Sequence, residues 1–271
     1  MPNTIQIKAP AKVNLVLEVG AKDANNYHPV ITVMQSLELH DLVLVSKNFS
    51  KKIVTTMECG LESNDPDYFE VPQISSAENI ATKAAEKFFE EFEIRNPGLE
   101  INISKKIPAQ AGMGGGSSDA AAVLKACAEL FGFNIENPST LVKLEKIGAK
   151  LGADVNFFFH TPCALMEHYG EIFVKNLKPL ENEIIVRKPE VGLSTAKMYE
   201  ALDAREEIPD LDISKYLTIN AAKDLKLYNS FQQIAREISP EIDNTLKSLE
   251  QEFGKGKALL CGSGSACFAL I

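Results

Sequence analysis

The chain has 271 residues, of which 45% are hydrophobic and 24% charged, and its formal net charge is −9. These proportions are typical of a globular protein with one large or two modest domains, whose core needs no disulfide or structural metal. The negative charge makes nucleic acid and anionic membranes poor partners. The five cysteines form no CxxC pair, and neither a signal-peptide pattern nor a long apolar stretch is present, so we expect a soluble cytoplasmic protein with reduced thiols.

The N-terminal third is expected to be antiparallel β-structure. Hydrophobic residues occupy every odd position of residues 5–19, which indicates a half-buried strand whose other face carries Lys12 and Asn14. Pro10 suggests an edge or a bulge in this strand, because proline cannot donate a ladder hydrogen bond. A turn over residues 21–30 and further strands over residues 30–39 and 41–46 are predicted to follow.

The middle of the chain is expected to alternate helices and strands. Ser75 and Glu78 form a capping box ahead of hydrophobic residues at helical spacing, so a helix is predicted there, ending near residues 96–98. A strand over residues 99–108 comes next. A glycine-rich loop and a helix that Gly132 ends are predicted after it.

In the second half of the chain, a helix is predicted to begin after residues 137–139 and to close at Gly152, which places Asp154 just beyond its end. An apolar strand is expected over residues 155–159. The remaining predictions are a strand at 183–189, helices at 194–203, 215–236 and 239–253, and a strand–turn–strand at 257–271. Strands followed by helices in this order indicate an α+β fold.

Residues 108–118 contain four glycines followed by two serines, directly before a helix of small residues. A loop of this kind exposes backbone N–H groups at the positive end of the helix dipole, and it therefore favours an anion such as phosphate. The Walker A pattern fails because no lysine precedes Ser117 or Ser118. The dinucleotide fingerprint fits Gly112, Gly114 and Ser117 only with serine as its last glycine, and it belongs in a first βα turn rather than in mid-chain. A tight turn without a ligand is the third alternative.

Three motifs, in one order, resemble those of the GHMP small-molecule kinases. The second motif of that family, Pro-x3-Gly-x-Gly-x2-Ser-Ser-x-Ala, is matched by Pro108, Gly112, Gly114, Ser117, Ser118 and Ala120. The first motif is matched by Pro10, Ala11, Lys12, Val13, Asn14 and Leu15, and the third by Gly262, Ser263 and Gly264. The resemblance implies a two-lobed α+β kinase fold. Its β-rich N-terminal, ATP-binding lobe, similar to a ribosomal protein domain, is expected over residues 1–155, and an α+β C-terminal lobe over residues 156–271.

The resemblance also implies phosphoryl transfer from ATP, with Mg²⁺ as a second cofactor. The hydroxyl of Ser117 or Ser118 can reach a phosphate or the Mg²⁺ that bridges phosphates. The expected nucleotide-binding residues are Pro108, Ala111, Gly112, Met113, Gly114, Gly115, Gly116, Ser117 and Ser118, with Asn79, Lys105 and Lys106 near the adenosine.

The resemblance implies Asp154 as catalytic base and Lys12 as its cationic partner near the transferred phosphoryl group. A carboxylate is a far weaker base than hydroxide, so Asp154 would orient the alcohol and take its proton late. The expected substrate-binding residues are Asn14, Tyr27, His28 and Asp154. The resemblance implies that Tyr27 stacks on a cytosine ring and that His28 hydrogen-bonds its polar edge; without it, this pair reads as a surface turn. His160 and His168 fit either the same cleft or a core or surface position.

Four positions depart from the family pattern, and they are Asn26, His168, Tyr169 and Ser230. The sequence also ends at Ile271, directly after the third motif, where relatives usually add a helix and a strand. The expected partners are ATP and a cytidyl diphosphate alcohol, with no nucleic acid and no membrane, and we expect a monomer or a weak homodimer. The alternatives are a GHMP kinase for another small alcohol and a catalytically silent nucleotide-binding protein, although the presence of Lys12 and Asp154 argues against the latter.

Overall fold

The computed structural model describes residues 2–65, 68–95, 98–205 and 207–271, which pack as two units, each built from separate stretches of chain. Unit 1 consists of Met1–Ala11, Glu38–Ala109 and Gly114–Phe159. Unit 2 consists of Lys12–Leu37, Gln110–Met113 and His160–Ile271. The lobe boundary that the sequence predicts at residue 155 stays a proposal.

The strands of unit 1 form a mixed sheet. Two long strands, β1 (Thr4–Val19) and β2 (Val30–Lys47), contribute residues to both units. In unit 1, β2 pairs antiparallel with β4 (Leu99–Lys105), and β4 pairs parallel with β3 (Ile53–Cys59), which gives the order β3-β4-β2-β1. The last residue of β4, Lys105, pairs with Cys59 of β3, and the chain enters the glycine loop at Pro108.

The strand β2 is continuous, so the prediction of two strands at 30–39 and 41–46 was wrong. Residues 42–47 pair with β4, and residues 32–35 pair with another strand in unit 2. Asp41, the first residue of the second predicted strand, is fully buried within β2. Its carboxylate accepts hydrogen bonds from the backbone N–H groups of Lys106 and Ile107, so this polar side chain has partners inside a continuous strand.

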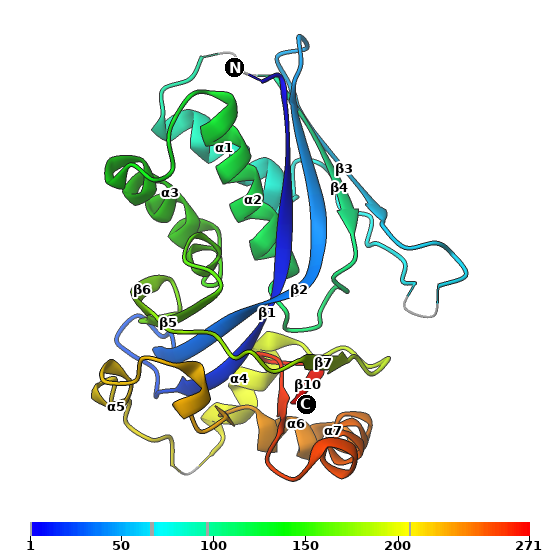
Figure 1. Cartoon of the computed structure of the whole chain (residues 1–271), viewed down its shortest axis with the longest axis vertical. Helices are drawn as coiled ribbons and strands as arrows, with labels where there is room; N and C mark the ends of the chain where they lie inside the picture. Colours follow the sequence, from blue (N-terminus) through cyan, green and yellow to red (C-terminus); the bar gives the residue numbers. More distant parts are fainter. Residues whose placement is uncertain (1, 66–67, 96–97, 206) are drawn as a thin grey trace. The chain divides into compact units, whose positions relative to one another are not determined.

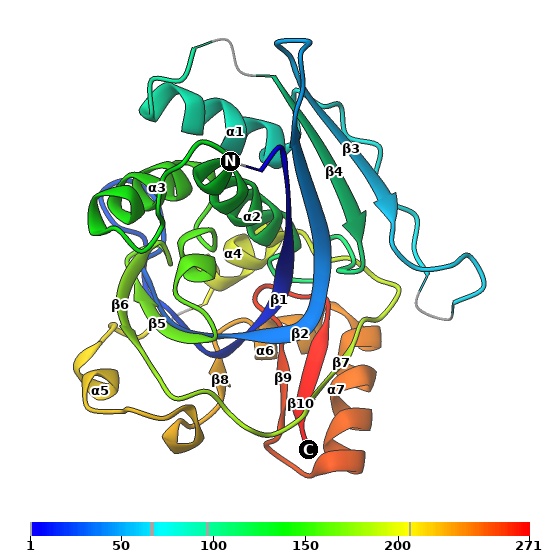
Figure 2. The same ribbon diagram turned by 45° about the horizontal axis from the view of Figure 1, so that its top comes forward.

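Three helices pack together beside the sheet of unit 1, as Figure 1 and Figure 2 show. They are α1 (Ile80–Glu91), α2 (Gly115–Leu130) and α3 (Pro138–Leu151). Phenylalanine rings join α1 to the end of α2, with the ring centroid of Phe89 lying 5.3 Å from that of Phe131. The helix α2 is buried on nearly all sides, which fixes the direction of its axis and hence the position of its first turn.

The ends of these helices differ from the predictions at several points. The helix α1 begins at Ile80, because Asn79 rather than Ser75 is its N-cap and accepts the N–H of Ala81 at 2.9 Å. The predicted Ser75–Glu78 contact exists at 2.7 Å but stabilises the preceding turn. The helix ends at Glu91, and of the predicted stop at 96–98, residues 96 and 97 lie outside the described residues.

Two segments adopt other structures than the sequence pattern suggested. The predicted strand at 155–159 is instead a short 3-10 helix, η1 (Asn156–Phe159), since a run of consecutive buried residues does not separate a strand from a helix. The predicted helix at 215–236 is broken into four short elements. They are α5 (Ser214–Leu217), η2 (Ala222–Asp224), β8 (Tyr228–Asn229) and α6 (Gln232–Ile238).

Unit 2 contains two sheet regions. The strand β1 pairs parallel with β8, and β2 pairs antiparallel with β5 (Cys163–Glu167), which pairs with β6 (Ile172–Asn176). The predicted strands near the C-terminus are confirmed, and they form a separate antiparallel sheet in the order β7-β10-β9. Their bounds are β7 (Ile184–Arg187), β9 (Ala258–Leu260) and β10 (Cys267–Leu270).

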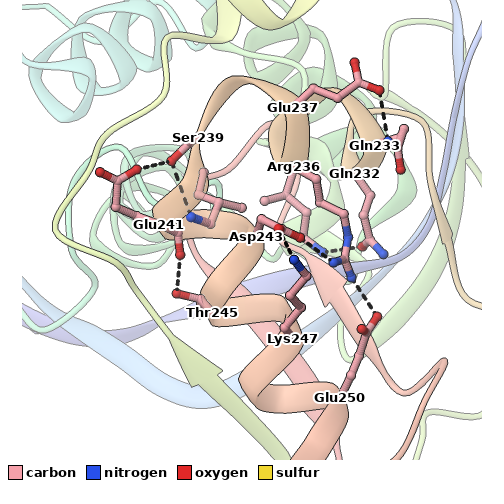
Figure 3. A network of polar contacts seen from close by, with 12 residues as sticks. Gln232, Gln233, Arg236, Glu237, Ser239, Glu241, Asp243, Thr245, Lys247 and Glu250 are labelled. Carbon is pink, nitrogen blue, oxygen red and sulfur yellow. Dashed lines mark hydrogen bonds and ion pairs between the residues drawn. The ribbon is translucent and has the colours of Figure 1, made fainter.

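The helices of unit 2 cover this C-terminal sheet. The helices α4 (Thr195–Asp203) and α7 (Pro240–Phe253) match the predictions closely, and α7 contacts β9 and β10. Figure 3 shows how α6 and α7 are joined: the guanidinium of Arg236 contacts Asp243 and Glu250, each at 2.7 Å. The side chain of Ser239 caps α7. This packing buries a hydrophobic core that includes Leu260 of β9 and Cys267 of β10, on either side of the third motif.

Candidate active site

The first turn of α2 is the candidate anion-binding element of unit 1. Gly114 is its N-cap with φ 72°, a left-handed conformation that glycine adopts without strain, and no described side chain caps this helix end. The N–H of Ser118 bonds to the carbonyl of Gly114 at 2.9 Å. The N–H groups of Gly115, Gly116 and Ser117 precede it, and Gly116 is exposed. Residues 115–118, expected as loop, therefore present the open amides of a helix N-terminus.

The turn that carries Asp154 lies beside this helix end. Gly152 is the C-cap of α3, and a β-carbon on it would lie 3.5 Å from the Oγ of Ser117. Asp154 is half-buried in the turn that follows. Ser118 is 1% exposed, and its Oγ has no hydrogen-bond partner among the described residues. Unit 1 therefore brings Asp154, Ser117 and Ser118 to one end of α2 and α3.

Lys105 and Asn79, both expected near the adenosine, have buried partners within unit 1. The Nζ of Lys105 pairs with the carboxylates of Asp41 and Asp119, the latter at 2.6 Å. Burial alone would lower the pKa of Lys105, but the charges of Asp119 and Asp41 outweigh it and raise that pKa. Burial raises the pKa of the Asp119 carboxyl to about 7. Asn79 caps α1, and its Nδ2 lies 3.2 Å from the Sδ of Met57.

A hydrogen-bonded chain in unit 2 orients Lys12. Its Nζ donates to the Oδ1 of Asn14 at 2.7 Å, and Asn14 Nδ2 donates to the hydroxyl of Thr32 at 2.8 Å. That hydroxyl donates to the carbonyl of Val16 at 2.7 Å. Lys12 is only 3% exposed, so the strand face that read as polar is buried here. The ammonium is thereby held in one direction by residues of β1 and β2.

The first motif and the hairpin that carries the third motif hold the middle of the glycine-rich segment. In unit 2, the N–H of Lys12 donates to the carbonyl of Met113 at 2.9 Å, and the N–H of Ala266 donates to that of Ala111 at 3.2 Å. The side chains of Met113 and Ala111 are buried, so they offer a ligand only their backbone. A β-carbon on Gly262 would lie 3.3 Å from the Nζ of Lys12. The first and third motifs therefore meet, although some 250 residues separate them in sequence.

Asn229 supports the hairpin of the third motif from β8. Its Nδ2 donates to the carbonyls of Leu260 and Gly262, each at 2.8 Å, and its Oδ1 accepts the N–H of Phe231 at 2.9 Å. Ser230, which departs from the family pattern, accepts the N–H of Val19 at 3.0 Å through its hydroxyl. The serine at this position therefore makes a hydrogen bond to β1.

A cavity of about 700 Å³ in unit 2 borders this hairpin. Gln110 and Gly112 line it from the glycine-rich segment, and Ser263 lines it from the third motif. The start of α4 also lines it, and there the hydroxyl of Thr195 lies 2.9 Å from that of Ser263. Space for a small molecule is thus available next to the motif residues of unit 2.

The turn that carries Tyr27 and His28 also lies in unit 2. The ring of Tyr27 is 65% exposed, and its centroid lies 5.4 Å from that of Tyr169. His28 is buried: its Nδ1 donates to the carbonyl of Gly20 at 2.7 Å, and its ring stacks on Tyr199 of α4 at 4.9 Å. The Nε2 of His28 lies 3.1 Å from the Oδ1 of Asp203, the last residue of α4.

The structure also describes four further residues that the sequence analysis named, which are Asn26, Tyr169, His168 and His160. Asn26 has φ 64°, the left-handed conformation that asparagine tolerates in place of glycine. The hydroxyl of Tyr169 donates to Asp23 at 2.5 Å, and this bond lowers the pKa of the Asp23 carboxyl. His168 contacts Glu171 at 2.5 Å, while His160 stacks on Phe173 with centroids 3.7 Å apart.

Several residues of these sites escaped the sequence analysis. Asp41 carried a usable signal, an acidic residue within an apolar strand pattern, and Asp119 directly follows the two serines of the second motif. Thr32 and Tyr199 carried none, because nothing local distinguishes a threonine in a strand or a tyrosine in a helix. In the part of the chain that the structure describes, no three His, Cys, Asp or Glu residues are placed to hold a metal ion. Within the same residues, none of the helices has the length and apolar character to span a membrane.

Comparison with known proteins agrees with the three motifs. Residues 79–161 match the GHMP kinases N terminal domain, and residues 187–271 match the GHMP kinases C terminal domain. A 4-diphosphocytidyl-2-C-methyl-D-erythritol kinase of Exiguobacterium sibiricum is 35% identical over 98% of this chain and 89% of its own length. The protein of the same name from Clostridium perfringens is 34% identical over 98% of this chain and 88% of its own length. The chain therefore belongs to the GHMP kinases, and it is an ATP-dependent small-molecule kinase.

The fold comparison gives the same family. A crystal structure of 4-(cytidine 5'-diphospho)-2C-methyl-D-erythritol kinase superimposes with a TM-score of 0.74 at 29% identity, covering 98% of this chain and 90% of that one. The expected family and the α+β GHMP kinase fold are thus confirmed. The individual roles of the site residues stay predictions.

Proposed function

We propose that this chain uses ATP to phosphorylate the 2-hydroxyl group of 4-(cytidine 5'-diphospho)-2-C-methyl-D-erythritol, in the non-mevalonate route to isoprenoid precursors. Its relatives with that name are similar over nearly the whole chain. The structural observation that carries phosphoryl transfer is the open first turn of α2. There the N–H groups of Gly115, Gly116 and Ser117 are available to phosphate oxygens, and the helix dipole favours a negative charge.

Lys12 supplies a fixed positive charge in this proposal. Phosphoryl transfer depends mostly on positioning and on stabilising the charge of the transferring group. The bond from Lys12 to Asn14, itself fixed by Thr32, orients the ammonium before substrate binds. Since Lys12 is almost fully buried, water screens its charge weakly, and its effect on a nearby phosphoryl group is large.

Asp154 acts as the base in this proposal. It follows the end of α3 in a turn whose Gly152 lies next to Ser117. A carboxylate there orients the alcohol oxygen for in-line attack and accepts its proton once the new O–P bond has begun to form. The proton therefore ends on Asp154, and ADP leaves with the electron pair of the broken bond.

Mg²⁺ is the second proposed cofactor, and it would neutralise phosphate charge. The hydroxyl of Ser118 fits a role in holding it, because this buried oxygen has no hydrogen-bond partner among the described residues. Ser117 is the second candidate, half-buried at the same helix end. A site of few protein ligands suits Mg²⁺, which usually keeps several waters and binds substrate phosphates.

Recognition of the cytidyl group is assigned to the turn with Tyr27 and His28. The exposed ring of Tyr27 offers a face for stacking on a base, which is worth about 1–3 kcal/mol. The buried ring of His28 stacks on Tyr199 of α4 and thereby supports the turn that carries Tyr27. A base that lacks the matching polar edge would leave buried groups unpaired, which is the stronger source of selectivity.

The test is a coupled assay of ATP turnover with a panel of alcohols. The panel contains the cytidyl diphosphate alcohol together with mevalonate, homoserine and galactose. We expect turnover with the cytidyl compound alone, and a loss of about a hundredfold to ten-thousandfold in kcat for Asp154→Asn. Glu129→Gln, an exposed substitution on α2, serves as the control and keeps full activity. Equal turnover in wild type and Asp154→Asn would remove Asp154 from the mechanism.

One observation favours a second candidate, a GHMP kinase for another small alcohol. Tyr169 stands where the family pattern has a small residue, and its ring packs beside Tyr27. Turnover of a different alcohol in the same panel would support this candidate.

A location in the cytoplasm is proposed from the supply of ATP and from five free thiols. The expectation of a monomer or weak homodimer stays a prediction.

A further inference from the structure

A buried cluster of charged side chains fixes the point at which the chain enters the glycine loop. Asp41 is fully buried in β2. Its Oδ1 accepts the N–H of Lys106 at 2.5 Å and that of Ile107 at 2.8 Å, and its Oδ2 pairs with the ammonium of Lys105. Since Ile107 directly precedes Pro108, these bonds hold the last residues before the loop.

The same cluster holds the point at which the chain leaves the loop. Asp119 lies one turn into α2, and its Oδ2 accepts a hydrogen bond from the Nζ of Lys105 at 2.6 Å. Gly115, the first residue of α2, packs against the entry: a β-carbon there would lie 3.0 Å from Cγ2 of Ile107 and 3.5 Å from the Nζ of Lys105. Lys105 thus connects the end of β4 with the first turn of α2.

Stability alone does not explain a buried cluster of this kind. Removing three charged groups from water is costly, and well-packed apolar side chains of similar volume often stabilise a protein as much or more. Charged hydrogen bonds have a preferred direction and a short length, so they restrict the backbone more closely than apolar contacts do. The cluster therefore suits a role in positioning.

The glycine loop requires such support from its ends. Between Pro108 and Gly116 the only polar side chain is that of Gln110, so few side chains of the loop can hold its shape. A phosphate site works only when its donors are held to within about 0.5 Å of their productive places. The direction of the open N–H groups in the first turn of α2 consequently depends on how the two ends are fixed.

We propose that Asp41, Lys105 and Asp119 are positioning residues that set the affinity for ATP by holding the two ends of the glycine loop. This inference rests on the function proposed above. Lys105, which the family resemblance placed near the adenosine, then acts through the backbone of the loop and without touching the base.

The test measures nucleotide binding by calorimetry in the absence of any alcohol. In Lys105→Met we expect the Kd for ATP to rise about tenfold to a hundredfold, because the ends of the loop shift. Asp119→Asn should have a smaller effect, since its amide oxygen still accepts from Lys105. The double variant Lys105→Met/Asp119→Asn should bind ATP better than Lys105→Met alone. In the single variant the carboxylate of Asp119 is buried without its partner, and the double variant replaces it with a neutral amide.

Two comparisons separate positioning from other roles. Thr82→Val removes a buried hydrogen bond to Thr55 away from the loop, and this control should lower stability without changing the Kd for ATP. Loop positioning predicts equal losses for ATP and GTP, whereas direct contact with the base predicts a loss for ATP only. An unchanged Kd in folded Lys105→Met, or a loss confined to ATP, would overturn the inference.

Failure of the proposed function gives a different result. A wild-type protein that binds ATP but phosphorylates no cytidyl alcohol would contradict the proposed substrate, while the binding data would still decide the role of the cluster. If Lys105→Met does not fold, the near-isosteric Asp119→Asn decides by the same measurement: a Kd equal to that of wild type would overturn the inference.

Discussion

Gly112 packs so closely against Cys261 that a β-carbon on Gly112 would lie 2.0 Å from the carbonyl oxygen of Cys261. Gly112 also has φ 73°, which other residues adopt at a cost. We therefore expect Gly112→Ala to lower the free energy of unfolding by about 2–4 kcal/mol, from backbone strain and forced movement of the hairpin. Urea unfolding measures this loss.

Gly116→Ala is the matched control for that prediction. A β-carbon on Gly116 would meet only Cγ2 of Ile80, at the ordinary contact distance of 3.7 Å. Because alanine is the better helix former by about 1 kcal/mol, this variant should be as stable as wild type or more stable. Equal losses in both variants would contradict the role of the Gly112 contact.

Replacing Lys12 should affect catalysis far more than stability. Lys12→Met removes the charge that Asn14 orients, and we expect kcat to fall about a hundredfold to a thousandfold. Thr32→Val keeps the shape of the core but removes the hydroxyl that fixes Asn14, so a smaller fall in kcat is expected. Steady-state kinetics at saturating ATP gives both values, and a Lys12→Met variant with normal kcat would be inconsistent with the proposed role.

Asn229 is expected to be a major contributor to stability. Asn229→Ala leaves two carbonyls and one N–H without their buried partner, and each such group costs about 1–3 kcal/mol. Ser230→Ala removes a single bond, to the N–H of Val19, and should cost about 1 kcal/mol. Unfolding curves of the two variants should differ clearly, and a similar small loss in both would show that the hairpin does not depend on Asn229.

The cysteines should differ in reactivity toward iodoacetamide. Burial raises the pKa of Cys163 and Cys267 to about 12, and it also raises the pKa of Cys127 and Cys261. Since the thiolate is the reacting form, these four thiols should stay unlabelled at pH 8 until the protein unfolds.

The half-buried Cys59 should then be the single site of labelling in the native protein. Mass spectrometry of the intact protein would show one added group before denaturation and five after it. Cys59→Ser should show none in the native state. Rapid labelling of Cys127 in native protein would mean that α2 is less protected than its burial indicates.

Short-range patterns accounted for much of the fold and for the choice of family. The helices α4 and α7 and the hairpin near the C-terminus were predicted closely, because helical spacing and turn residues act over a few positions. The prediction failed for α6 and its neighbours, where a helical pattern over 215–236 is interrupted by pairing of β8 with β1. Pairing with a distant strand is not encoded in local spacing.

The candidate site likewise contains features that local sequence patterns predict and features that only distant contacts determine. By itself the sequence determined the glycine loop, the three motifs and the family, since each depends on residue types at fixed short spacings. Only the tertiary structure decided that Asp41 supports the loop and that Thr32 orients Asn14. These partners lie far apart in the chain, and a hydrogen bond or ion pair is set by direction and burial in space, neither of which a one-dimensional pattern contains.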